Sequence, residues 1–253
     1  MSTLYIVATP IGNLNDISLR ALEILKAVDF VACEDTRHTL KLLTHFEIKK
    51  TLVSCHANDE ERGAANVIRL LNSGKEGAYC TDAGTPGLSD PGAVLARLAR
   101  EDGHRIVPVP GPSAFAAIVS AAGFGGRSVL FDGFLSVKPS KRRARIAEVM
   151  GRREAVVFYE SPFRIAKLIG EIANVDAERM VCVGRELTKI HEELVVGRAG
   201  ELRSRFIGGR KGETAADENG DFAIVEKGEF VVLVSGTPGE APDKDEREGS
   251  AER

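Results

Sequence analysis

Residues 78–92 decide the fold, and they read Ala78-Tyr79-Cys80-Thr81-Asp82-Ala83-Gly84-Thr85-Pro86-Gly87-Leu88-Ser89-Asp90-Pro91-Gly92. The run that ends at Thr81 predicts a strand, and the apolar residues after Gly92 recur on one helical face. Ser89 or Asp90 can cap that helix, with Pro91 or Gly92 in its first turn. Residues 82–87 have no such structural explanation. Because glycines let a backbone approach a ligand closely, these residues predict a ligand-binding loop.

The same unit of strand, turn and helix recurs on both sides of this stretch. Strands are predicted at residues 4–9, 30–33, 51–55, 78–81 and 105–109, with helices between them. This alternation predicts an α/β fold with a largely parallel sheet whose faces are covered. The glycines of residues 123–126 then interrupt the pattern and predict an interdomain joint.

A second α/β half follows the joint. Its strands are predicted at residues 129–134, 155–159, 180–183, 193–196 and 230–234, and its helices near residues 141–150 and 162–173. We therefore predict an N-terminal domain over residues 1–122, a C-terminal domain over residues 127–235 and a disordered tail over residues 236–253. The glycine-rich, charged residues 208–228 predict a mobile loop.

Two further turns lie between a predicted strand and a helix. Residues 9–14 contain a single glycine, so the G-x-G-x-x-G turn of dinucleotide-binding folds is absent there. In residues 109–114, Pro112 can open a helix with Ser113 in its first turn. Ligands of open α/β sheets bind at the carboxyl ends of the strands, so these turns and residues 82–87 can form one rim. A plain turn and simple helix initiation remain alternatives.

Polar clusters follow three other strands. They are residues 33–38, residues 158–164 and residues 184–189. In the first cluster Thr36 can cap the following helix, and a cap with a surface ion pair is the alternative to a functional role.

The composition favours a cytoplasmic protein. The chain has 253 residues, of which 43 % are hydrophobic, and a formal net charge of -3. Residues 1–8 do not have the basic start that is typical of a leader, and no apolar run approaches the roughly 20 residues of a membrane span. Four separated cysteines without a C-x-x-C pair predict buried thiols, and five histidines without ligand spacing predict no metal.

One basic run stands out against the negative net charge. Residues 138–153 hold seven cations in sixteen positions and a single acid, Glu148. Unopposed positive charge favours binding to a phosphate backbone, while a solvated helix face is the alternative. The RNA-binding residues predicted from this run are Lys138, Lys141, Arg142, Arg143 and Arg145.

Seven motifs in the same order resemble the ribosomal RNA-modifying branch of the tetrapyrrole methylase superfamily. They are Thr-Pro-Ile-Gly-Asn-Leu at 9–14, Glu-Asp-Thr-Arg at 34–37, Asp-Ala-Gly-Thr-Pro at 82–86, Ser-Asp-Pro-Gly at 89–92, Pro-Gly-Pro-Ser-Ala at 110–114, Phe-Tyr-Glu-Ser at 158–161 and Arg-Glu-Leu-Thr-Lys at 185–189. The resemblance implies two α/β domains with S-adenosyl-L-methionine in the cleft between them, and a homodimer. It implies as acceptor the ribose 2'-hydroxyl of a decoding-region cytidine in 16S ribosomal RNA, free or in the small ribosomal subunit.

The resemblance also implies site residues. Those expected to contact the methyl donor are Pro10, Asp82, Ala83, Gly84, Thr85, Leu88, Ser113, Ala114 and Tyr159. Residues 34–37 and 185–189 are expected to face the RNA. The catalytic residues expected among them are Glu34, Asp35, Arg37, Glu186 and Lys189. One stretch departs from the family pattern S-x-H-x-H-N-E. Of the two histidines, the asparagine and the glutamate in that pattern, residues 54–60 keep only the first histidine, His56, and the glutamate, Glu60.

Methyl transfer to oxygen is an in-line displacement that requires alignment of donor and acceptor. A base should also take the hydroxyl proton, and the candidates are Glu34, Asp35, Glu186 and Lys189. We favour an acidic residue assisted by Arg37 or Lys189. The rival functions are methylation of a corrin or sirohaem precursor and RNA binding without catalysis. The basic run argues against the first rival, and the intact glycines of the donor loop argue against the second.

Overall fold

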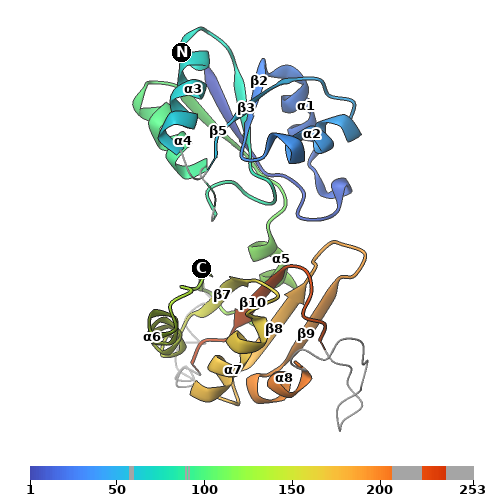
Figure 1. The fold of residues 1–253 in the computed structure, drawn as a ribbon, viewed down its shortest axis with the longest axis vertical. Coiled ribbons are helices and arrows are strands. Elements are labelled where there is room, and N and C mark those ends of the chain that lie inside the picture. The colour runs from blue at the N-terminus through green and yellow to red at the C-terminus, as the bar shows by residue number, and fades with distance from the viewer. Residues whose placement is uncertain (57–59, 89, 91, 207–223, 238–253) are drawn as a thin grey trace, which may run out of the picture. The chain divides into compact units, whose positions relative to one another are not determined.

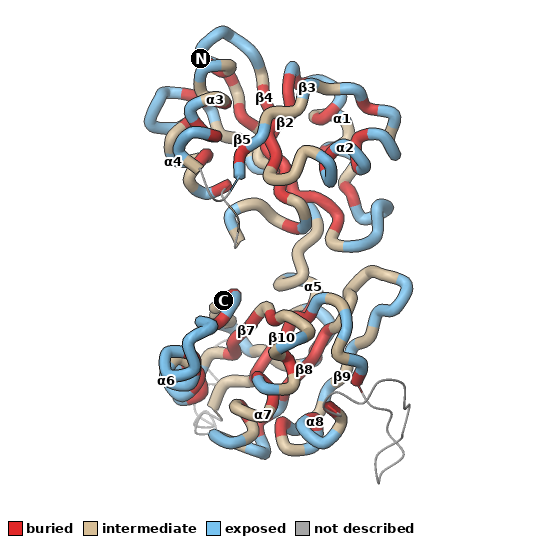
Figure 2. The backbone as a smooth tube through the Cα atoms, in the orientation of Figure 1, coloured by how far each residue is buried: buried red, intermediate tan, exposed pale blue. Residues whose placement is uncertain are grey.

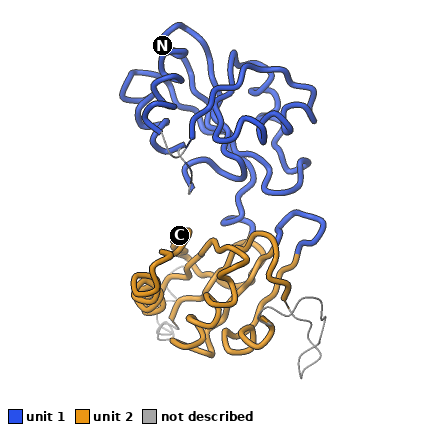
Figure 3. The backbone as a smooth tube through the Cα atoms, viewed as in Figure 1, with its two compact units in different colours: residues 1–117, 186–192 blue, residues 118–185, 193–253 orange. Residues whose placement is uncertain are grey.

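The chain folds into two compact units. A computed structural model describes residues 1–56, 60–88, 90, 92–206 and 224–237. Unit 1 comprises Met1–Ala117 and Glu186–Glu192, and unit 2 comprises Ile118–Arg185 and Glu193–Arg253 (Figure 3). The division falls before the glycine joint of residues 123–126, and the segment Glu186–Glu192 returns to unit 1, which the linear division by sequence did not foresee.

Unit 1 contains a five-stranded sheet (Figure 1). Its strands lie in the order β3-β2-β4-β1-β5. Every neighbouring pair is parallel, as predicted. The strands are β1 (Thr3–Val7), β2 (Phe30–Cys33), β3 (Thr51–Ser54), β4 (Gly77–Cys80) and β5 (Arg105–Val109). The helical elements are η1 (Leu14–Asp16), α1 (Leu19–Ala27), α2 (Thr36–His45), α3 (Glu60–Asn72) and α4 (Gly92–Glu101). Helix α5 (Ala114–Ala121) begins in unit 1 and ends in unit 2.

Helices cover both faces of this sheet because strand side chains alternate between two cores. In β2, Val31 packs in one core with Leu25 of α1 and Leu43 of α2. The neighbouring Phe30 packs in the other core, which α3 and α4 complete. Strands β2 and β4 are buried along their whole length (Figure 2). The sheet is therefore doubly wound, and the loops after its strands gather at its carboxyl edge.

Unit 2 contains a second five-stranded sheet in the order β6-β7-β10-β8-β9. Only β6 and β7 are parallel, and the other three pairs are antiparallel. The strands are β6 (Val129–Phe134), β7 (Ala155–Glu160), β8 (Met180–Arg185), β9 (Glu193–Arg198) and β10 (Phe230–Val234). The helices are α6 (Pro139–Met150), α7 (Ile165–Val175) and α8 (Ala199–Arg205). The predicted α/β half is present, but α8 was not predicted, and α7 begins at Ile165 because residues 161–164 form a turn.

The cysteine prediction is confirmed, since all four thiols are free and buried. No group of three metal-ligating side chains occurs within the described residues. No helix there is long and apolar enough to cross a membrane.

Two predictions fall largely outside the described residues. These are the mobile loop, of which residues 207–223 are not described, and the tail, of which residues 238–253 are not described. The predicted tail begins too early, because Thr237 is bound to the fold. Its N–H and hydroxyl donate to the carbonyl oxygen of Arg152 at 2.8 and 3.0 Å.

Candidate active site

Residues 82–85 tie the strand-end loops of unit 1 together. Thr9, after β1, and Gly84, after β4, exchange two backbone hydrogen bonds of 2.9 and 3.0 Å. Gly84 has a φ of +86°, which favours glycine, and a Cβ there would lie 3.4 Å from Ile11 Cγ2. The loop that carries Pro10 is thereby fastened to the loop that carries Asp82, Ala83 and Gly84.

The same loop reaches two further strand ends. The Thr85 hydroxyl donates to the carbonyl oxygen of Pro112 at 3.0 Å, next to Ser113 and Ala114 at the start of α5. The backbone N–H of Asp35, after β2, donates to Asp82 Oδ1 at 3.1 Å. The structure therefore brings most of the residues predicted to contact the methyl donor, together with Asp35 of those predicted to face the RNA, to one edge of one sheet.

Asp90 shapes the rest of the loop after β4. Its carboxylate accepts hydrogen bonds from the N–H groups of Gly87 and Gly92, both at 2.7 Å. Asp90 is thus a cap of α4, as predicted, while Ser89 and Pro91 lie outside the described residues. The hydroxyl of buried Tyr79 lies 3.3 Å from Asp90 Oδ1, a contact that the sequence did not reveal. Leu88 is half-buried in this loop.

Asp35, and not Thr36, is the N-cap of α2. Asp35 Oδ1 accepts from the backbone N–H of Arg37 at 2.8 Å, and the Arg37 guanidinium pairs with Asp35 Oδ2 at 3.0 Å. These hydrogen bonds lower the pKa of Asp35 to about 2. The structural alternative, a cap plus an ion pair, therefore accounts for the contacts that Asp35 and Arg37 make.

The neighbouring Glu34 has the opposite electrostatic surroundings. Burial raises the pKa of Glu34, and the negative charges of Asp82 and Asp90 raise it further, while His56 lowers it. A carboxylate with a raised pKa is a stronger base than an ordinary one.

The segment Glu186–Glu192 brings two more predicted residues to unit 1. Within the segment, Lys189 Nζ pairs with Glu186 Oε1 at 2.8 Å. The Thr188 hydroxyl accepts a hydrogen bond of 3.1 Å from the N–H of Asn13, in the loop after β1. Glu186 and Thr188 have φ angles of +49° and +68°, which are strained for residues with a side chain.

Gly12 permits the close contact between the loop after β1 and the segment Glu186–Glu192, and the sequence analysis did not assign it a role. A Cβ at this position would lie 2.3 Å from Lys189 Cγ and 3.0 Å from Thr188 Oγ1. The lone glycine of residues 9–14 was visible in the sequence, but its partner lies far along the chain.

Tyr159 lies in β7 of unit 2. Its ring makes edge-to-face contacts with Phe131 and Phe134, with ring centroids 4.9 and 5.7 Å apart. Its predicted contact with the methyl donor stays a prediction.

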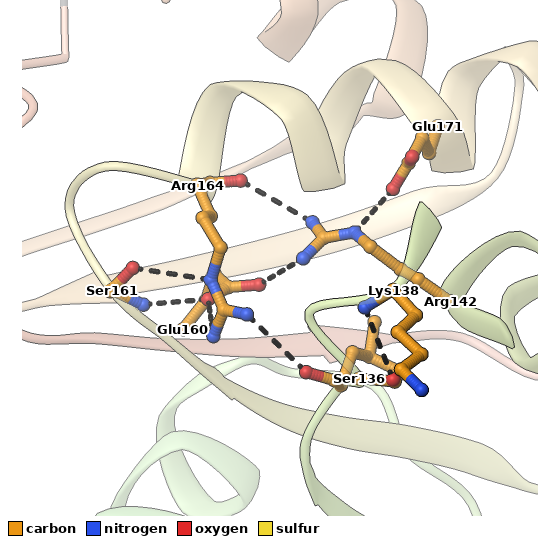
Figure 4. Close-up of polar contacts among 8 residues, drawn as sticks. Ser136, Lys138, Arg142, Glu160, Ser161, Arg164 and Glu171 are labelled. Carbon is orange, nitrogen blue, oxygen red and sulfur yellow. Dashed lines mark hydrogen bonds and ion pairs between the residues drawn. The ribbon is translucent and has the colours of Figure 1, made fainter. Parts of the chain in front are cut away.

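The prediction that Arg142 binds RNA is wrong. Arg142 is only 2 % exposed, because its guanidinium is ion-paired inside unit 2. It pairs with Glu160 at 2.7 Å and with Glu171 at 2.5 Å, and it donates to the carbonyl oxygen of Arg164 at 3.4 Å (Figure 4). The opposing acids lie on β7 and α7, so a charge count along α6 could not reveal them.

Arg145 is also not an unopposed cation. Its Nε donates to Asp132 Oδ1 of β6 at 2.9 Å, and its Nη1 pairs with Glu148 at 2.6 Å. These hydrogen bonds raise the pKa of Arg145. Lys138, Lys141 and Arg143 are exposed, and no carboxylate of the described residues pairs with them. The helical period places Lys138 and Lys141 on one side of α6 and Arg143 on another.

The sequence matches a known family over most of its length. A family model described as Tetrapyrrole (Corrin/Porphyrin) Methylases matches residues 3–203. Two proteins named Ribosomal RNA small subunit methyltransferase I illustrate the relatives. The one from Borrelia garinii subsp. bavariensis is 44 % identical over 92 % of this chain and 98 % of its own length. The one from Pseudomonas aeruginosa is 40 % identical over 98 % of this chain and 83 % of its own length.

Solved structures share the fold at low sequence identity. Uroporphyrin-III-C-methyltransferase from Thermus thermophilus has a TM-score of 0.62 and 18 % identity, over 92 % of this chain and 94 % of that one. Diphthine synthase has a TM-score of 0.64 and 15 % identity, over 92 % of this chain and 90 % of that one. At these identities the likeness concerns the fold and leaves the acceptor open.

Proposed function

The chain belongs to the tetrapyrrole methylase family, and we propose that it methylates the ribose 2'-hydroxyl of a decoding-region cytidine in 16S ribosomal RNA, with S-adenosyl-L-methionine as donor. The observation that carries this proposal is the match to relatives named for small-subunit ribosomal RNA methylation, which spans 92 % of this chain at 44 % identity. The acceptor is the RNA alone or the small ribosomal subunit, and we include in the proposal a homodimer in the cytoplasm.

The carboxyl edge of the unit 1 sheet fits the methyl donor. Within the described residues, no acceptor takes a hydrogen bond from the backbone N–H of Ala83 or Thr85, although both flank the fixed position of Gly84. Ala83 is exposed and Thr85 is half-buried, so both N–H groups are open to a polar ligand. Pro10, Asp82, Leu88, Ser113 and Ala114 would complete the donor site from the adjoining loops of unit 1. The contact of Tyr159 with the donor stays a prediction.

S-Adenosyl-L-methionine supplies an electrophilic methyl group when it is bound. The chain's own residues have to orient the ribose and take the proton from its 2'-hydroxyl, which is a poor nucleophile near neutral pH. We assign the role of base to Glu34, because it lies after β2 beside Asp35 at the carboxyl edge of the unit 1 sheet, and because burial and two nearby carboxylates raise its pKa. Asp35 is a weaker base than Glu34, since Arg37 holds the pKa of Asp35 at about 2.

Lys189 and Glu186 have a different part in this proposal. Their ion pair lies on a strained segment that is fastened to the loop after β1. Backbone strain of this kind is kept where the surroundings hold a functional geometry. We assign Lys189 to the RNA as a cation whose position Glu186 fixes.

A transfer assay tests the proposed acceptor class. The purified protein would be incubated with S-adenosyl-L-methionine labelled in the methyl group, and with either small ribosomal subunits that lack the modification or a uroporphyrin-type tetrapyrrole. Label should enter the RNA of the subunits and not the tetrapyrrole. Label in the tetrapyrrole alone would overturn the proposal in favour of the rival function.

A further inference from the structure

Exposed apolar side chains gather at one edge of the unit 2 sheet. Phe134, Val137 and Phe163 are 57, 79 and 93 % exposed. Strands β6 and β7 are parallel, so the loops that follow them leave the sheet at the same edge. Phe134 ends β6 and Val137 follows it, while Phe163 lies in the loop after β7. A single exposed apolar residue needs no explanation, but three at or just after the ends of two neighbouring strands do.

The loop that carries Phe163 is held by half-buried Arg164 and buried Glu160. The N–H of Arg164 donates to the Ser161 carbonyl oxygen at 3.0 Å, which closes the turn around Phe163. The Arg164 guanidinium pairs with fully buried Glu160 at 2.7 Å and donates to the Leu135 carbonyl oxygen at 3.4 Å (Figure 4). This last bond fastens the Phe163 loop to the loop after Phe134. The exposed aromatic ring therefore extends from an ordered backbone, so a ligand need not order that loop on binding.

Two lysines at the start of α6 follow Val137 closely in the sequence. Lys138 directly follows Val137, and its N–H donates to the Ser136 hydroxyl at 3.3 Å. Lys141 lies three residues further, on the same side of α6. No described carboxylate pairs with either lysine.

We propose that Phe134, Val137, Phe163, Lys138 and Lys141 form an RNA-stacking edge, which binds unpaired nucleotides of the substrate RNA. Aromatic side chains beside free cations suit single-stranded RNA, because bases stack on the rings while lysines neutralise phosphates. A second copy of this chain is the other possible occupant. A symmetric contact would bring this patch of both copies together, so that four lysines would share one interface to which the patch itself contributes no acid, which disfavours that occupant. The proposal rests on the proposed function, since it deepens the choice of RNA as acceptor.

The test measures the affinity of the full chain for a short, fluorescently labelled, single-stranded oligoribonucleotide of mixed sequence. Fluorescence anisotropy would give this affinity at several salt concentrations. Phe163→Ala should weaken binding roughly 5- to 100-fold, because a stacked base is lost, and should leave the salt dependence unchanged. Phe163→Trp should restore binding. The double change Lys138→Ala and Lys141→Ala should reduce the slope of log affinity against log salt by about 1.4. Val175→Ala, which changes another exposed apolar residue of unit 2, serves as the matched control and should bind normally.

Wild-type affinity in Phe163→Ala would overturn the stacking edge. So would normal RNA binding combined with a loss of self-association in sedimentation, which would assign this edge to contact between copies. Failure of the proposed function can be told apart from failure of the RNA-stacking edge. It would appear as absence of methyl transfer to small subunits by the wild-type chain, whatever the effect of Phe163→Ala on RNA binding.

Discussion

Glu34 and Asp35 are neighbours in the sequence, yet their carboxylates differ in strength as bases. Asp35 caps α2 and is hydrogen-bonded to Arg37, so its pKa falls to about 2. Glu34 is half-buried near two other carboxylates, so its pKa rises above the ordinary value of 4.5. The motif itself did not distinguish the two, because the difference arises from Asp82 and Asp90 on another loop.

Glu34→Gln should therefore lower the rate of methyl transfer about 10²- to 10⁴-fold at near-neutral pH, the usual contribution of a positioned base. Asp35→Asn is the matched control, since asparagine is also a good helix cap, and it should cost much less activity. Single-turnover rates with small ribosomal subunits would measure both. Equal losses in the two variants would contradict the assignment of Glu34.

The pH dependence of the same rate follows from the raised pKa of Glu34. A base must be deprotonated to act, so activity should be lost as the pH falls through the pKa of Glu34. The midpoint of that loss should lie above the ordinary carboxyl value of 4.5. A midpoint at or below that value would mean that another group takes the proton.

Arg142 stabilises the fold of unit 2 and does not bind a ligand. Removing one partner of a buried ion pair costs about 3–5 kcal/mol, because an uncompensated charge stays behind. Arg142→Ala should lose stability of this order, since Glu160 and Glu171 would both lose a partner. The exposed Arg143→Ala on the same helix should change stability by less than about 0.5 kcal/mol. Urea unfolding followed by circular dichroism would compare them, and equal stabilities would argue against the buried network.

At the scale of elements, the loop after β1 and the segment Glu186–Glu192 form a contact between distant parts of the sequence. Gly12 permits it, because a Cβ there would lie 2.3 Å from Lys189 Cγ. Gly12→Ala should displace the segment and lower the methyl-transfer rate by about 10²-fold, the effect of misplacing a reacting group by an ångström. Gly170→Ala is the control, because the nearest atom to a Cβ there is 4.0 Å away. An unchanged rate in Gly12→Ala would show that the position of Lys189 does not matter to the reaction.

The sequence predicted well those helices and strands whose pattern of apolar residues lies within a short stretch of the chain. The unit 1 sheet follows from alternating strands and helices, each of which is encoded within a few residues of chain. The unit 2 sheet is different, because β10 comes last in the chain and inserts between β7 and β8, which no local pattern encodes. The acids that neutralise Arg142 and Arg145 were missed for the same reason. The loops of the candidate site could be predicted, but the hydrogen bonds that join them could not.

At the scale of the whole molecule, each unit has its own sheet and core, and the proposed reaction draws on both. Unit 1 carries the strand-end loops assigned to the methyl donor and Glu34 as the proposed base. Unit 2 carries Tyr159 and the RNA-stacking edge. The central claim is that these parts serve one reaction, methyl transfer to a ribose oxygen of small-subunit RNA.

The most direct measurement is mass analysis of nucleosides from small-subunit RNA, after incubation of unmodified subunits with S-adenosyl-L-methionine and either the wild-type chain or Glu34→Gln. The wild-type chain should produce 2'-O-methylcytidine, and Glu34→Gln should produce far less in the same time. A methyl group on a base, or no methylated nucleoside despite donor binding, would contradict the claim.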